Sequence, residues 1–150
     1  MAEGYKLPVS VLVVIHTADL QVLLLERADR PGFWQSVTGS QEAGETLRQT
    51  ARREVYEEAA LEADDFELVD WRRENRYEIY LRWRGRYAPG ITHNTEHVFG
   101  LRLPGTLPVK LAAREHLQLM WLPWRDASDQ VFSSSNADAI RELPRRKKHP

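Results

Sequence analysis

The first part of the chain is dominated by apolar, β-branched runs that predict strands. The stretch Pro8–Thr17 is apolar nearly throughout, which is typical of a strand buried on both faces. The polar turn Ala18–Gln21 separates it from a second run, Val22–Glu26, and the two predict a hairpin with a loop longer than two residues. A short third strand is expected over Phe33–Thr38, followed by a loop over Gly39–Glu45.

Later segments predict four further strands, over Phe66–Trp71, Tyr77–Trp83, Glu96–Leu103 and Leu117–Leu122. In all but the third of these, apolar and polar residues alternate with period two, as in strands with one buried face.

A four-residue periodicity predicts the clearest helix. Its apolar positions are Leu47, Ala51, Val55 and Ala59. Thr46 and Gln49 have the spacing of a capping box, and the helix should end near residues 60 to 62. A second helix is expected over Ser133–Leu143, which opens on a Ser/Asn capping cluster. This order of strands, helix, strands and helix predicts an α+β fold or an α/β/α sandwich around a mixed sheet, and not a regular βαβ array.

Composition narrows the class of protein. With 150 residues, 42% apolar and 29% charged, the chain is expected to form one folded domain over residues 1–144, followed by a disordered basic tail over 145–150. The net charge of −1 argues against a bulk nucleic-acid coat protein, and the absence of Cys excludes disulfides and thiolate metal sites. We see neither a signal peptide nor an apolar run of membrane length, so we expect a cytoplasmic protein without a membrane partner.

Three glutamates gather on one turn of the first predicted helix. Glu54, Glu57 and Glu58 have i, i+3, i+4 spacing and fall within an arc of roughly 100°. On a helical wheel Glu58 lies between Leu47 and Ala51, so the carboxylates share the edge of the apolar stripe, at the rim of the core. Because like charges this close repel, two interpretations stay open: a solvated face balanced by nearby Arg, or a site for a divalent cation.

A longer pattern surrounds this turn. It consists of Gly39, five residues, Glu45, seven residues and then the segment Arg53-Glu54-Val55-Tyr56-Glu57-Glu58-Ala59-Ala60-Leu61. This resembles the signature of the Nudix hydrolases at every fixed position but one, because Ala60 stands where the family has Gly. We expect that change to affect only the end of the helix. A strained backbone angle that only Gly adopts easily would be relaxed at Ala60. The resemblance implies an α/β/α sandwich with a mixed sheet, and hydrolysis of a nucleoside diphosphate linked to a further group.

The resemblance also implies a site. In the family, the glutamates matching Glu54, Glu57 and Glu58 hold Mg²⁺ or Mn²⁺, the one matching Glu45 supports the site, and the Arg matching Arg53 orients the carboxylates by ion pairing. Mg²⁺ prefers oxygen ligands, a bound water becomes a nucleophile near neutral pH, and a carboxylate must take its proton. Glu115, just before the last predicted strand, is expected as a further metal ligand or general base, or else as an exposed loop acid. The expected metal ligands are Glu54, Glu57, Glu58 and Glu115, and the expected catalytic residues are Glu57, Arg53 and Glu115.

Segments outside the signature point to the substrate. They are Pro8–Ile15, Phe33–Ser40, Arg86–Gly90 with Thr92, Asn94–Glu96, and Glu115–Leu117 with Trp121 and Leu122. They resemble the bacterial branch of the family that acts on 7,8-dihydroneopterin triphosphate in folate synthesis, releasing pyrophosphate and leaving the monophosphate. The positions that match substrate contacts in that branch are Lys6, Arg27, Thr38, Tyr77, Glu78, Ile79, Tyr80 and Ser133.

These positions have chemical roles that fit a pterin triphosphate. Cations are suited to phosphates, tyrosines to the faces of a flat ring, and hydroxyls to phosphate or pterin edges. Each also has a plain structural interpretation: Lys6 as a solvated terminal residue, Arg27 as a surface strand residue and Tyr77 as ordinary strand packing.

The segment Arg76–Arg86 carries four Arg among aromatic residues. Three interpretations stay open: a strand with outward Arg, a face toward the triphosphate, or a surface for single-stranded nucleic acid. We expect a small-molecule triphosphate as partner, no nucleic acid, and a monomer or weak homodimer. The alternative functions are another Nudix pyrophosphatase, acting on ordinary or oxidised nucleoside triphosphates, dinucleoside polyphosphates or capped RNA, and a degenerate domain that binds without catalysis.

Overall fold

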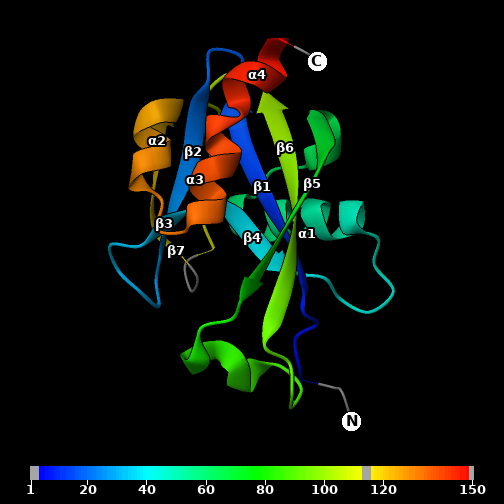
Figure 1. Cartoon of the computed structure of the whole chain (residues 1–150). Coiled ribbons are helices and arrows are strands. Elements are labelled where there is room, and N and C mark those ends of the chain that lie inside the picture. Colours follow the sequence, from blue (N-terminus) through cyan, green and yellow to red (C-terminus); the bar gives the residue numbers. More distant parts are fainter. Residues whose placement is uncertain (1–3, 113–115, 149–150) are drawn as a thin grey trace.

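The strand β1 (Val9–Thr17) is the centre of a mixed sheet in the computed structural model, which describes residues 4–112 and 116–148 (Figure 1). It pairs in parallel with β6 (His93–Leu103), and antiparallel with β2 (Gln21–Arg27) and β4 (Val37–Ser40). The remaining strands are β5 (Glu67–Glu78), antiparallel to β6, and β3 (Trp34–Gln35) and β7 (His116–Pro123), both antiparallel to β2. The predicted hairpin of the first two strands is confirmed by the pairing of His16 with Val22.

Helices cover both faces of this sheet, so the predicted α/β/α sandwich is confirmed. Val11, Val13 and Ile15 of β1 pack with the apolar stripe of α1 (Leu47–Ala59) on one face. Leu12 and Val14 pack on the opposite face, where the helices lie in front of the sheet in Figure 1. Those helices are α2 (Trp124–Gln130), α3 (Ser134–Arg141) and α4 (Leu143–Lys148), and two short 3₁₀ helices, η1 (Ala63–Asp65) and η2 (Leu81–Arg86), complete the structure.

The ends of α1 decide where its glutamates lie. The capping box forms as predicted: Gln49 N donates to the Thr46 hydroxyl at 3.1 Å, and Thr46 N donates to the Gln49 side chain at 2.8 Å. At the other end, Ala60 adopts the left-handed conformation (φ 56°, ψ 33°), and its N–H donates to Tyr56 O at 2.9 Å. The expectation that Ala60 relaxes this backbone angle is therefore wrong, because the capping hydrogen bond is made in the conformation that favours Gly.

The single strand expected over Phe33–Thr38 is two strands, β3 and β4. β3 pairs with β2 and β4 pairs with β1, so the chain changes partner at Ser36. Ser36 N donates to Asn136 Oδ1 of α3 at 2.8 Å in place of a ladder bond. β4 also runs on through Ser40, into the residues expected to form a loop.

The strand expected over Tyr77–Trp83 is also wrong. β5 continues to Glu78 because β6 offers a partner up to His93, and beyond that pair the chain turns into η2. The Trp83 N–H donates to Tyr80 O at 2.9 Å and closes the turn. η2 lies beyond the end of β5, near the N-terminal segment (Figure 1), and Lys6 N donates to Arg86 O at 2.8 Å.

The C-terminal segment is more ordered than expected. Ser133 caps α3 as predicted, but the helix ends at Arg141, α4 follows, and α2 was not predicted at all. Residues 145–148, expected to belong to a basic tail, lie in α4, where the Arg146 guanidinium donates to Trp71 O at 3.1 Å and stacks on the Trp71 ring at 4.4 Å. Residues 149 and 150 lie outside the described residues. Within residues 4–112 and 116–148, no helix is long and apolar enough to cross a membrane.

Candidate active site

The Glu54 side chain lies directly against the backbone of Gly39 in β4. A Cβ atom at position 39 would stand 2.0 Å from the Glu54 Cδ and 2.3 Å from each of its carboxylate oxygens. Only Gly therefore allows this approach, which gives the first residue of the sequence pattern a physical role. The missing side chain of Gly39 leaves a cradle, in which the Glu54 carboxylate lies against the backbone of β4.

Arg53 connects the acidic residues of the pattern. Its Nε and Nη2 donate to the two oxygens of Glu45 at 2.7 and 3.0 Å, and Nη1 donates to Glu54 Oε1 at 2.7 Å. Nη1 also lies 3.4 Å from Glu57 Oε2, and Nη2 donates to Ser40 O at 2.9 Å. One guanidinium thus joins the loop, the strand β4 and the helix α1, and it pairs with the carboxylates as the sequence pattern predicts.

Glu45 is held as firmly as Arg53. Its Oε1 accepts a hydrogen bond from Glu42 N and another from the Thr50 hydroxyl, both at 2.9 Å. The hydrogen bonds from Arg53 lower the pKa of Glu45 from 4.5 to about 2. These contacts make Glu45 a support for the position of Arg53.

The three glutamates of α1 differ in environment. Glu54 is 9% exposed and Glu58 is 2% exposed, whereas the Glu57 side chain is half exposed to solvent. Burial raises the pKa of Glu54, and Glu58 and Arg53 oppose that rise. His116 Nε2 lies 3.3 Å from Glu58 Oε1, and burial together with the charge of Arg27 lowers the pKa of His116 to about 4, so the imidazole is neutral at pH 7.

The donor set fits a hard divalent cation. In the described part of the chain, no three His, Asp or Glu side chains are arranged to enclose a metal ion. Mg²⁺ does not require such a cage, because it is commonly held by one or two carboxylates together with substrate phosphates and water. The cradle at Gly39 and the carboxylates of Glu54, Glu57 and Glu58 meet that requirement. Glu115, the fourth expected ligand, lies outside the described residues.

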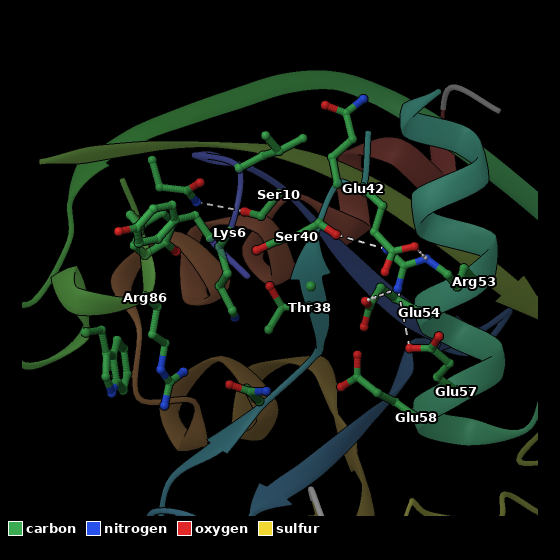
Figure 2. Close-up of a pocket in the computed structure, with 18 of the residues that line it drawn as sticks. Lys6, Ser10, Thr38, Ser40, Glu42, Arg53, Glu54, Glu57, Glu58 and Arg86 are labelled. Atoms are coloured by element: carbon green, nitrogen blue, oxygen red, sulfur yellow. Dashed lines mark hydrogen bonds and ion pairs between the residues drawn. The ribbon is translucent and has the colours of Figure 1, made fainter. Parts of the chain in front are cut away.

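These carboxylates line one end of a cavity of about 920 Å³. Figure 2 shows Glu54, Glu57 and Glu58 on one side, Lys6 and Arg86 on the other, and Thr38 between them. The cavity therefore presents both signs of charge. That is the distribution expected for a polyanion that binds with a divalent cation, since cationic side chains can meet the phosphate oxygens that the cation leaves exposed.

A second cavity of about 390 Å³ adjoins the first and shares part of its lining, including Arg27, Thr38 and Tyr77. The other expected substrate contacts on the second cavity are Glu78, Ile79, Tyr80 and Ser133. The structure thus brings all eight expected substrate contacts onto two adjoining cavities, since Lys6 lines the first.

Local partners restrict what some of these residues can do. The Arg27 guanidinium is paired with both Asp29 oxygens at 2.7 and 2.6 Å, so part of its charge is already neutralised. The Thr38 hydroxyl donates to Val11 O at 2.9 Å, which leaves it acceptor capacity toward a ligand but no proton for a phosphate. The Ser133 hydroxyl accepts from Asn136 N at 3.1 Å as the cap of α3.

The tyrosines and their neighbours form an aromatic wall. The Tyr77 hydroxyl accepts from Asn94 Nδ2 at 3.0 Å, and burial raises the pKa of Tyr77 to about 12. Tyr80 packs edge-on against Trp83 with 5.2 Å between ring centroids. Both rings line the second cavity.

Several residues that line these cavities were not predicted as site residues, among them Trp83, Glu96 and His116. Trp83 was expected in a strand, and its position depends on the turn after Glu78. The available signal for Glu96 was an acid at the start of an otherwise mostly apolar predicted strand.

A family model described as the NUDIX domain matches residues 6–143 of the chain. That range includes both cavities' described lining residues from Lys6 onward, so the match and the geometry cover the same part of the molecule. The chain belongs to the Nudix family.

Two curated relatives carry the same name. Dihydroneopterin triphosphate diphosphatase of Escherichia coli K12 is 47% identical over 142 residues, which cover 93% of this chain and 93% of the relative. The enzyme of that name from Haemophilus influenzae is 41% identical over 141 residues, covering 92% of this chain and 88% of the relative.

Two solved structures of Nudix proteins are similar to this chain. The E. coli dihydroneopterin triphosphate pyrophosphohydrolase superposes with a TM-score of 0.86 at 46% identity, covering 93% of this chain and 97% of that chain. A NUDIX hydrolase from Listeria monocytogenes gives a TM-score of 0.79 at 25% identity, with 95% of each chain covered.

Proposed function

We propose that this protein hydrolyses dihydroneopterin triphosphate to dihydroneopterin monophosphate and pyrophosphate. The observation that carries the proposal is the 47% identity to the E. coli enzyme of that name over 93% of both chains. The two adjoining cavities support it, because one offers carboxylates and cations to a triphosphate and the other offers aromatic rings to a flat base.

Nudix hydrolases generally use a divalent metal ion, and we assign Mg²⁺ to Glu54, Glu57, Glu58 and Glu115 of this chain. When bound, the ion neutralises phosphate charge and makes water a stronger nucleophile. The chemistry of the donors supports this assignment, since all four are carboxylates and Mg²⁺ prefers oxygen.

The residues of the chain have distinct roles in this proposal. Glu57 takes the proton of the attacking water, because all three carboxylates line the cavity and Glu57 is the one that is half exposed to solvent, whereas Glu54 and Glu58 are buried. Arg53 contacts both Glu54 and Glu57 and fixes their orientation. Glu115 is the alternative base.

The substrate is proposed to lie across both cavities. Lys6, Arg27 and Arg86 face the phosphates in the larger cavity, and Tyr77 and Tyr80 flank the pterin in the smaller one. In that orientation the phosphoanhydride bonds lie toward α1, where the carboxylates are.

A substrate panel tests the proposal. The purified protein is given dihydroneopterin triphosphate, purine nucleoside triphosphates and dinucleoside polyphosphates, each with and without Mg²⁺, and kcat/KM is compared. We expect pyrophosphate from the pterin compound, at the highest kcat/KM and only with Mg²⁺. No turnover of that compound beside brisk hydrolysis of another nucleotide would remove the substrate assignment and leave the family intact.

We also propose a cytoplasmic location and a monomer or weak homodimer. Light scattering over a range of protein concentrations tests the oligomeric state, and a stable tetramer would contradict it.

A further inference from the structure

Glu96 is a buried acid in the middle of the sheet. In β6 it is paired with Ser10 of β1 on one side and with Asn75 of β5 on the other. It is 5% exposed, yet it lines the smaller cavity. Its strand neighbour two residues on, Val98, belongs to the core on the α3 side, so Glu96 lies on that same face.

The contacts of Glu96 are those of a carboxylate with only neutral groups at hydrogen-bond distance. Asn75 Nδ2 donates to its Oε1 at 3.4 Å, and Ser135 of α3 makes a further side-chain hydrogen bond. Arg73 acts on it through its charge, but among the described residues the ion pairs of Arg73 are with Asp138 and Glu142. A carboxylate buried in this way is costly unless hydrogen-bond donors satisfy it.

The cavity around Glu96 suits a flat base. Aromatic side chains from the end of β5, from η2 and its flanking residues, and from the C-terminal part line the cavity, namely Tyr77, Tyr80, Trp83, Tyr87 and Phe132. Asn136 also lines the cavity, but its amide is already used, since Oδ1 accepts from Ser36 N and Nδ2 donates to the Ser36 hydroxyl.

Two other acids line this cavity, and both differ from Glu96. The side chains of Glu78 and Asp138 are more than half exposed to solvent. Their hydrogen bonds with a ligand would compete with water, whereas those of Glu96 would not.

We propose that Glu96 is a specificity-determining residue that reads the edge of the base. A pterin presents two adjacent donors, the N3–H and the 2-amino group, and an ionised carboxylate is a pure acceptor with two oxygens to receive them. The inference rests on the proposed function for the identity of the natural base. Guanine presents the same pair of donors, and hypoxanthine lacks the amino group.

The test compares GTP with ITP, which differ only in that amino group. Wild-type protein with Mg²⁺ should show kcat/KM for GTP higher than for ITP by roughly 10- to 100-fold, the effect of one hydrogen bond to a buried charged group. In Glu96→Gln one acceptor becomes a donor that faces the donors of the base. We expect GTP and dihydroneopterin triphosphate to lose about that factor while ITP changes little, so the GTP/ITP ratio approaches one.

Asp138→Asn is the matched control, because it removes an acid from the same cavity at an exposed position. It should leave the GTP/ITP ratio unchanged. Thermal denaturation shows whether Glu96→Gln folds. The GTP/ITP ratio of the wild-type protein tests the inference even if that variant does not fold.

Two results would overturn the inference: a wild-type GTP/ITP ratio near one, or an unchanged ratio in folded Glu96→Gln. A purely structural role for Glu96 would lower stability and slow GTP and ITP equally. Failure of the proposed function has a different signature, namely no turnover of the pterin compound while the GTP/ITP ratio still responds to Glu96→Gln.

Discussion

Glu58 illustrates how a single side chain can combine burial with charge. It is 2% exposed, lies 3.3 Å from the neutral His116 imidazole and lines the larger cavity. Solvent cannot balance a carboxylate in that position as it would on an open helix face. Of the two interpretations of the glutamate cluster, this burial favours the cation site over the solvated face.

Replacement of Glu58 with Gln is expected to lower kcat by at least about 100-fold, because it keeps the shape and removes one charge of the proposed metal site. The measurement is pyrophosphate release with saturating Mg²⁺. Glu67→Gln is the control, since Glu67 is an exposed acid of β5 that lines neither cavity, and it should leave kcat unchanged. Full activity in Glu58→Gln would show that the metal is held by other residues.

Ala60 keeps a backbone conformation that favours Gly. A non-Gly residue in the left-handed region costs roughly 1 kcal/mol, so Ala60→Gly should raise the free energy of unfolding by about that amount. Urea denaturation measures the change, and kcat should not move. Ala59→Gly, one residue earlier and inside α1, should instead destabilise by about 1 kcal/mol or more. Equal effects of the two substitutions would contradict this account.

Glu45 gives the molecule a specific sensitivity to acid. Its pKa is about 2 in the folded protein against 4.5 ordinarily, so between these values the unfolded chain binds more protons and stability falls as pH falls. The stabilisation is fully present above pH 4.5. We therefore expect the stability difference between metal-free wild type and Glu45→Gln to be constant at neutral pH and to shrink from pH 4.5 toward 2. A difference that grows with acid would contradict the sign.

At the scale of elements, the pattern of apolar and polar residues predicted those features that depend on nearby residues alone. β1 reads as buried on both faces because α1 and α3 cover it, and the capping box of α1 is contained in four residues. The cluster of Glu54, Glu57 and Glu58 was predictable for the same reason, since the three residues share one turn of α1. The division between β3 and β4, the turn into η2 and the inward position of Glu96 all depend on which strand lies alongside, and that is a non-local property.

The link between Ser36 and Asn136 carries one of these non-local features. Asn136 accepts from Ser36 N at 2.8 Å and donates to the Ser36 hydroxyl at 2.9 Å, which ties α3 to the point where the chain leaves β3 for β4. Asn136→Ala leaves a buried N–H unsatisfied, so we expect a loss of about 1–3 kcal/mol in the free energy of unfolding. Urea denaturation measures it, with the exposed Asp138→Asn on the same helix changing stability by less than about 0.5 kcal/mol. Similar stabilities for the two variants would show that the link is dispensable.

At the scale of the whole molecule, the two cavities are bordered by helices from opposite faces of the sheet. α1 on one face carries the carboxylates of the larger cavity, and α3 on the other face borders the smaller one, where Ser133 and Glu96 lie. Residues of β2 and β4, Arg27 and Thr38, line both cavities. The substrate proposed above would therefore lie across both cavities, with its phosphates in the larger cavity and its base in the smaller one.

The last prediction is that the protein keeps its fold when the metal ion is removed. The two core clusters consist of apolar side chains and include none of the α1 glutamates, so chelation should abolish hydrolysis and leave the circular dichroism spectrum unchanged. Mg²⁺ should nevertheless raise Tm, because it binds the folded carboxylate site and relieves repulsion among Glu54, Glu57 and Glu58. The rise should depend on Mg²⁺ concentration in wild type and be smaller in Glu54→Gln, measured by differential scanning fluorimetry beside the surface control Glu67→Gln. An identical rise in all three proteins would mean that Mg²⁺ acts elsewhere on the surface, and the assignment of the α1 glutamates as its ligands would fail.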